Sequence, residues 1–145
     1  MNMKSSDDIW NEVIHKVCSI DFPTENQVLN EAFLVFQYYS ELESGGHEAL
    51  LNWWSEYISE VGITTYIKEL TKVLEKIAAQ EYAVILQKYG EEMWKNFVAL
   101  ENGEIDEYSF YQVVEKADRE YYKLEDKLQH LLESYFVSIH TDIIE

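Results

Sequence analysis

The chain has 145 residues, and 47% of them are hydrophobic, which is enough for one domain with a buried core. It carries 28 Asp and Glu residues against 11 Lys and Arg residues, a formal charge of -17. Long-range repulsion therefore disfavours direct binding to nucleic acid or to an anionic membrane. The single cysteine, Cys18, permits no internal disulfide, and its apolar neighbours favour a place in the core. Without an apolar leader or a membrane-length apolar run, we expect a cytoplasmic protein.

Apolar residues recur with helical spacing along the whole chain, and alternating Val and Ile runs are missing. This pattern predicts one all-α domain, residues 1–145, of about six or seven helices. The first helix is expected after Ser6. Thr24 and Gln27 have the spacing of a capping box, which predicts the next helix start. Residues 28–42 carry apolar side chains on several sides, which is typical of a central helix.

The later helices are expected to be separated by glycines, because a left-handed backbone at a helix end favours a residue without a Cβ. Gly62, Gly90 and Gly103 are the predicted boundaries. Asp106 or Glu107 is expected to begin a short helix, and Asp118 the last long one.

The paired glycines Gly45 and Gly46 lie between two strongly apolar segments. A phosphate-binding loop would need a nearby Lys or Arg, whereas the neighbours here are acidic. We therefore expect a helix–helix corner without a ligand, with at least one glycine at positive φ. His47 and Glu48 would then lie in the first turn of the next helix.

No pattern in the sequence predicts a metal ion or a cofactor. Around Gly103, apolar residues and a serine replace the carboxylates of a calcium loop. Glu12 and His15 form a single Glu-x-x-His pair, where a di-metal site needs two. Nucleotide-binding and hydrolase motifs are missing as well. A non-catalytic protein is favoured, and a small enzyme with an unconventional site near His47 is the alternative.

Negative charge is segregated along the chain. Between Lys16 and Lys68 there is no Lys or Arg, whereas Lys68, Lys72 and Lys76 form a row with i, i+4 spacing. Regularly spaced carboxylates suit a basic partner surface, so we predict that this stretch binds a basic protein. The candidate residues flank the paired glycines or follow them along the next helix: Glu41, Glu43, Glu48, Glu56 and Glu60.

The segment SELESGGHEALLNWW, the later Val-Gly-Ile and the final DREYYKLEDKLQHLLESYF resemble the DNA-mimic-protein domain family. Its typical Asn-Gly-Gly-aromatic element is replaced here by Ser44, Gly45, Gly46 and His47. The resemblance implies a small acidic helical protein, a homodimer, whose surface imitates DNA and occupies the DNA-binding face of a repressor. The partner would then be a nucleic-acid-binding protein. A regulator or a toxin-neutralising, immunity-like protein would present a similar acidic surface.

Overall fold

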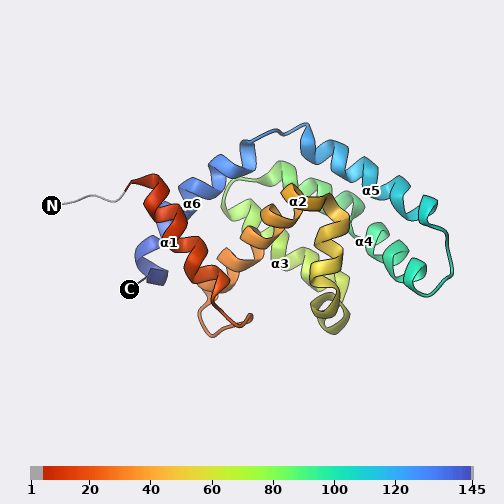
Figure 1. Cartoon of the computed structure of the whole chain (residues 1–145), viewed down its shortest axis with the longest axis horizontal. Coiled ribbons are helices and arrows are strands. Elements are labelled where there is room, and N and C mark those ends of the chain that lie inside the picture. Colours follow the sequence, from red (N-terminus) through yellow and green to blue (C-terminus); the bar gives the residue numbers. More distant parts are fainter. Residues whose placement is uncertain (1–4, 145) are drawn as a thin grey trace.

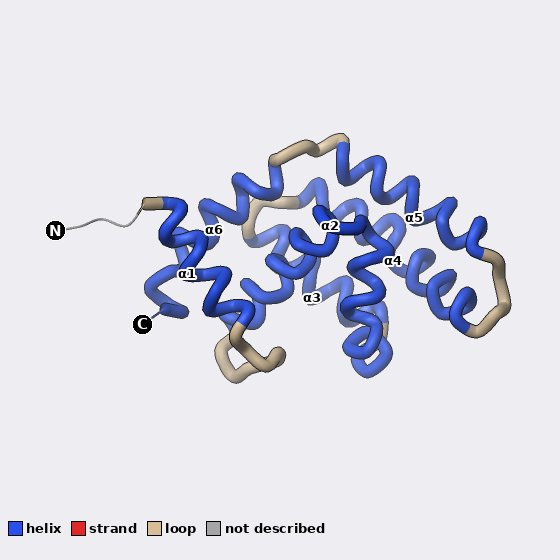
Figure 2. The backbone as a smooth tube through the Cα atoms, in the orientation of Figure 1, coloured by secondary structure: helices blue, strands red, loops and turns tan. Residues whose placement is uncertain are grey.

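Six α-helices account for the fold of residues 5–144, which are the residues that the computed structural model describes (Figure 1). In chain order they are α1 (Ser6–Cys18), α2 (Gln27–Val61), α3 (Ile63–Lys76), α4 (Gln80–Glu101), α5 (Glu107–Tyr122) and α6 (Lys127–Ile144). Within those residues there is no strand, and the connections are short (Figure 2). The prediction of a single all-α domain is confirmed, and the described residues form six helices.

The long helix α2 is the centre of the fold, because it packs against α1, α3, α5 and α6. Its first half is apolar on several sides, as the sequence predicts, and this half is enclosed by its neighbours. Ala32, Val35, Tyr38 and Leu42 are all fully buried. The second half of α2 turns away from the first at Gly45 and Gly46 (Figure 1).

The remaining helices form two groups, one at one end of the molecule and one that extends from its centre to the other end (Figure 1). At one end α1 packs against α6, so that segments near the two termini lie side by side. Trp10 of α1 contacts Phe136 of α6, with ring centroids 5.1 Å apart. In the second group α3, near the centre of the molecule, packs against α4, and α4 packs against α5. The central α2 therefore connects both groups.

The helix start predicted at Thr24 is wrong by two residues. Asn26 is the N-cap of α2, and its side-chain oxygen accepts a hydrogen bond from the Leu29 N–H at 3.2 Å. The Thr24 N–H instead donates to Asn30 Oδ1 at 2.7 Å. The Asn30 side chain thus accepts the hydrogen bond of the Thr24 N–H, and Asn26 caps the helix in place of Thr24.

The helix boundary predicted at Gly90 is also wrong, because this glycine lies inside α4. A Cβ at this position would be 2.5 Å from Cδ1 of Ile67 on α3. Gly90 therefore permits the close approach of α3 and α4. Gly62 and Gly103, by contrast, do follow helices and have positive φ, at 89° and 74°.

Two further expectations need correction. Asp118 does not begin the last helix, because α5 continues from its N-cap Asp106 through Asp118 to Tyr122, and α6 starts only at Lys127. The carboxylate of Asp118 accepts a hydrogen bond from α2 and does not cap a helix of its own. Cys18 is exposed and does not pack in the core. It is the last residue of α1, where Val13 and Val17 occupy the buried side.

None of the helices in residues 5–144 is both long enough and apolar enough to cross a bilayer.

Candidate protein-binding surface

The paired glycines form a corner within α2. Gly45 has φ -157° and ψ 16°, and Gly46 has φ 71° and ψ -161°, so the helical backbone is interrupted at both positions. The conformation of Gly46 is one that residues with a Cβ rarely adopt. We refer to residues 43–48 as the corner. It redirects the second half of α2, which carries three of the five predicted partner-binding carboxylates.

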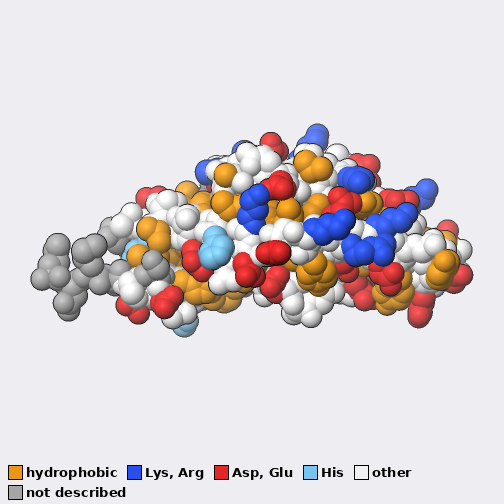
Figure 3. Space-filling model, turned by 90° about the horizontal axis from the view of Figure 1, so that it is seen from above, with side chains coloured by type: hydrophobic (Ala, Val, Ile, Leu, Met, Phe, Trp, Pro, Cys, Tyr) orange, Lys and Arg blue, Asp and Glu red, His pale blue; other side chains and the backbone are white. Residues whose placement is uncertain are grey.

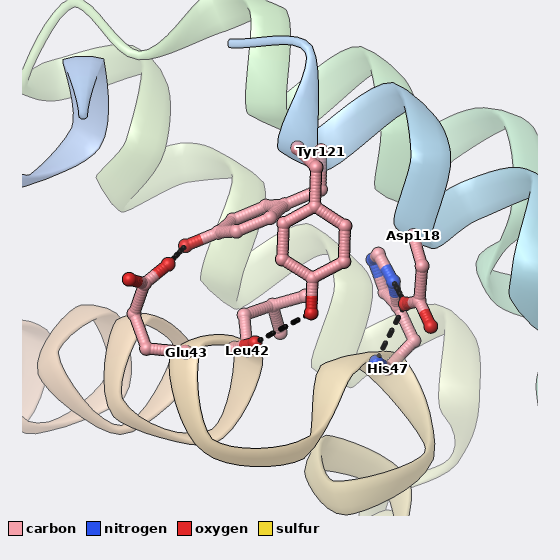
Figure 4. A network of polar contacts seen from close by, with 6 residues as sticks. Leu42, Glu43, His47, Asp118 and Tyr121 are labelled. Atoms are coloured by element: carbon pink, nitrogen blue, oxygen red, sulfur yellow. Dashed lines mark hydrogen bonds and ion pairs between the residues drawn. The ribbon is translucent and has the colours of Figure 1, made fainter. Parts of the chain in front are cut away.

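Asp118 of α5 holds the corner in place (Figure 4). Its Oδ1 accepts a hydrogen bond from the backbone N–H of His47 at 2.9 Å, and Nδ1 of the His47 ring lies 2.7 Å from the same oxygen. The carboxylate thus satisfies a backbone N–H that the interruption leaves without a helical partner. A Cβ on Gly46 would be 2.7 Å from Asp118 Oδ2. Glycine at position 46 therefore provides both the backbone conformation and the space for Asp118.

Two tyrosines of α5 bind the carboxylates that flank the paired glycines. The Tyr121 hydroxyl donates to Glu43 Oε2 at 2.9 Å (Figure 4). The Tyr111 hydroxyl donates to Glu48 Oε2 at 2.8 Å. Burial, followed by the hydrogen bond to Glu43, raises the pKa of Tyr121 well above its ordinary value. The hydrogen bond to Glu48 is the main reason that the pKa of Tyr111 is raised. Glu43 and Glu48 therefore have intramolecular partners.

The candidate carboxylates further along α2 lie in a different environment. Glu56 and Glu60 are exposed, and neither forms a hydrogen bond or an ion pair with another residue in the described range 5–144. They belong to residues 53–61, which we call the distal segment. Glu41 lies before the corner and is partly buried, and this burial raises its pKa. The structure thus separates the five candidates into two corner residues that accept hydrogen bonds from tyrosines, two distal residues that are open to solvent, and the partly buried Glu41.

Basic residues lie on other helices. The whole of α2 contains no Lys or Arg. In the view from above, Lys and Arg side chains gather over α5, and Asp and Glu side chains are more numerous towards the lower edge (Figure 3). On α3, Lys76 forms an ion pair of 2.9 Å with Glu31 of α2, whose side chain is nearly buried. The segregation of charge along the sequence is therefore also a segregation between helices.

His47, the residue of the alternative enzyme hypothesis, is completely buried. Its Nε2 has no hydrogen-bond partner among the described residues, and the ring packs edge-on against Tyr121 with centroids 6.4 Å apart. His47 does not line either of the two grooves that lie between α2 and the connection from α1 to α2. Within residues 5–144, no three or more His, Cys, Asp or Glu residues are grouped as metal ligands.

A comparison with protein families identifies the group to which this architecture belongs. The model of the family described as DMP19-like protein matches residues 24–140, which is most of the chain. The chain belongs to the DMP19-like family. The family resemblance seen in the sequence is thus confirmed. No curated protein and no solved structure matches the chain.

The family match covers α2, the corner and the α5 residues that hold it. The structure gives His47 of the corner a specific partner in Asp118. Sequence reasoning missed that partner, as well as Tyr111 and Tyr121, because they lie 63 to 78 positions away in the chain. The one signal available was the small residue at position 46, since a glycine often marks close approach of another group.

Proposed function

We propose that this DMP19-like protein is a non-catalytic DNA mimic, which covers the basic nucleic-acid-binding surface of a partner protein. The observation that carries this proposal is the charge of α2, which contains six glutamates and no Lys or Arg over 35 residues. A helix of one charge sign presents a field that attracts a basic surface and repels nucleic acid itself.

The distal segment is the part of α2 best placed to meet a partner. Glu56 and Glu60 are one helical turn apart, which corresponds to a rise of about 6 Å along the axis. Both are exposed and have no partner within residues 5–144, so a partner's cations need not displace an existing contact. Glu41, Glu43 and Glu48 would add to the negative field, while the tyrosine contacts of Glu43 and Glu48 also serve the fold.

A non-catalytic role is further supported by the environment of His47. A general base must reach the proton that it removes, and His47 is buried with its Nδ1 directed to Asp118. The family resemblance also implies a homodimer, which we include in the proposal. Two copies would present two α2 helices and therefore a larger acidic surface.

The experiment compares two charge-reversed variants that have the same net charge. In one, Glu56→Lys and Glu60→Lys alter the distal segment. In the control, Glu92→Lys and Glu115→Lys alter exposed residues of α4 and α5. The partner is captured from the native cell with the unaltered protein, identified, purified and tested for competition by duplex DNA.

We expect the distal pair to weaken the complex by about 100-fold or more, and the control pair by much less, because only the distal charges face the partner. Binding of the unaltered protein should weaken steeply as salt rises, because exposed charges are screened over ~8 Å at physiological ionic strength. A partner whose binding is indifferent to salt, to DNA and to the distal pair would refute the proposal.

A further inference from the structure

A groove of about 690 Å³ lies beside the distal segment, between α2 and the connection from α1 to α2. Its volume is in the range of ordinary ligand pockets, roughly 300–1,000 Å³. We call it the tryptophan groove, because Trp53 and Trp54 both line it. The exposed carboxylates Glu56 and Glu60 also line the groove.

Aromatic rings form the apolar wall of the tryptophan groove. Phe22 of the connection packs on Phe33 with centroids 5.1 Å apart and on Tyr57 at 5.2 Å. The ring of Trp53 contacts those of Phe33 and Trp54, with centroids 5.9 Å and 5.2 Å away. Trp53 nevertheless remains 48% exposed. The groove therefore offers a positioned indole ring with much of its surface free.

The charged residues that line the tryptophan groove all have the same sign. They are Asp21, Glu56 and Glu60, and each is exposed. A smaller groove of about 230 Å³ adjoins it and shares Phe22 and Tyr57 in its lining. That smaller groove is also lined by Lys72, whereas no Lys or Arg lines the tryptophan groove. The carboxylates of the tryptophan groove are therefore available to a cation from another molecule.

We propose that the tryptophan groove receives an arginine side chain from the partner protein, with the guanidinium stacked on Trp53 and paired with Glu56 and Glu60. This inference rests on the proposed function and names the group that the acidic surface recognises. It makes Trp53 a determinant of specificity, because the carboxylates alone attract any cation.

Arginine fits this combination of groups better than lysine for three reasons. Its planar guanidinium stacks on aromatic faces, and it is more weakly hydrated than an ammonium group. It also offers several N–H donors in a fixed arrangement, which suits paired carboxylates. Basic nucleic-acid-binding surfaces are rich in arginine, so a mimic that selects arginine would select such surfaces.

A second copy of this chain is a poorer occupant of the groove. Each copy carries a formal charge of -17, and Arg119 is the only arginine in the sequence. Arg119 lies on α5, directly after Asp118, which is the residue that holds the corner. Electrostatic complementarity therefore favours a basic protein of different sequence.

The test uses three blocked hexapeptides as probes. One contains two arginines, the second has lysine in their place, and the third has citrulline, which keeps the planar shape without the charge. Each is titrated into uniformly ¹⁵N-labelled protein to about 1 mM, where even a weak complex is detected by nuclear magnetic resonance. The indole N–H signal of Trp53, assigned with Trp53→Phe, reports occupation of the groove.

We expect the arginine peptide to shift the Trp53 indole signal, and the lysine peptide to bind about tenfold more weakly because it cannot stack as well. The citrulline peptide should not bind. Glu56→Gln with Glu60→Gln should weaken binding of the arginine peptide by about tenfold or more. The control pair, Glu92→Gln with Glu115→Gln, makes the same change in net charge and should alter it by no more than about twofold. An unshifted Trp53 signal, equal binding of the citrulline peptide or equal effects of the two pairs would overturn the inference.

The captured partner separates this inference from the proposed function. If the partner binds in a salt-dependent manner that duplex DNA competes with, but Trp53→Ala leaves its affinity unchanged, the groove assignment fails while the DNA-mimic proposal stands. If the arginine peptide occupies the groove but the protein binds no basic nucleic-acid-binding protein, the proposed function fails while the groove assignment stands. Circular dichroism of Trp53→Ala establishes that the helices are intact.

Discussion

The corner and the distal segment of α2 carry similar carboxylates in different circumstances. At the corner, Glu43 and Glu48 accept hydrogen bonds from tyrosines of α5. In the distal segment, Glu56 and Glu60 are exposed and have no partner within residues 5–144. The same residue type therefore stabilises the fold at one end and is open to another molecule at the other. Acidic composition alone does not distinguish these roles, whereas the contacts with α5 do.

The corner should be the more sensitive region to small changes in the backbone. Gly46→Ala should lower the free energy of unfolding by about 3 kcal/mol, because it combines a strained positive φ with overpacking against Asp118. Gly62→Ala, after the distal segment, is the matched control. Gly62 also has positive φ, but a Cβ there would contact nothing within 4 Å. Gly62→Ala should therefore lower the free energy of unfolding by less than Gly46→Ala does. Denaturant unfolding measures the free energy of both variants. Equal losses would show that Asp118 does not restrict position 46.

Removal of the carboxylate that holds the corner should have the next largest effect. Asp118→Ala leaves the His47 N–H and ring without their acceptor in a buried site, which should lower the free energy of unfolding by about 2 kcal/mol. Asp118→Asn keeps an oxygen acceptor and should lose less. Chemical denaturation of both variants provides the comparison. Unchanged stability in Asp118→Ala would mean that the corner is held by packing alone.

Alkaline pH should destabilise the protein through its buried tyrosines. Burial raises the pKa of Tyr121 and Tyr135 in the folded state above the ordinary value of about 10. Below pH ~10 these phenols are protonated in both states, so they cause no pH dependence. Above pH ~10 the unfolded chain releases protons that the folded chain retains, so stability falls as pH rises, by about 1.4 kcal/mol per pH unit for each such tyrosine. Denaturant unfolding between about pH 9 and pH 11 measures how steeply stability falls with pH, and Tyr121→Phe should reduce this slope. An unchanged slope in Tyr121→Phe would contradict the attribution of the pH dependence to Tyr121.

Tyr111 and Tyr121, the two tyrosines of α5 that donate hydrogen bonds to the corner, should differ modestly in their contribution to stability. Tyr121→Phe removes the hydroxyl that contacts Glu43 from a buried ring and should cost about 1 kcal/mol. Tyr111 is only half-buried, and its bond to Glu48 competes with water. Tyr111→Phe should therefore have a smaller effect on thermal unfolding. The reverse order would indicate that Glu48, and not Glu43, is the main attachment of the corner to α5.

The sequence was sufficient to predict the helical class, the central position of α2 and the corner at Gly45 and Gly46, because these depend on local periodicity and on backbone conformation. Gly90 was misassigned because a glycine inside a helix and a glycine after one look alike without the neighbouring Ile67. Asp118 was assigned to a helix start for a similar reason, since a side-chain acceptor suits its own helix as well as a distant one. The candidate carboxylates were found by charge, but the division between corner and distal residues depends on tyrosines far away in the chain.

The most direct test of this division compares two double variants, Glu43→Gln with Glu48→Gln and Glu56→Gln with Glu60→Gln, in one experiment that measures both unfolding and partner binding. The two variants have the same net charge, so long-range electrostatics affects them similarly. We predict that the corner pair lowers the unfolding midpoint and changes affinity little, whereas the distal pair keeps the midpoint and loses affinity by about tenfold or more. Loss of affinity in the corner pair, with a distal pair that binds as the unaltered protein does, would contradict the account.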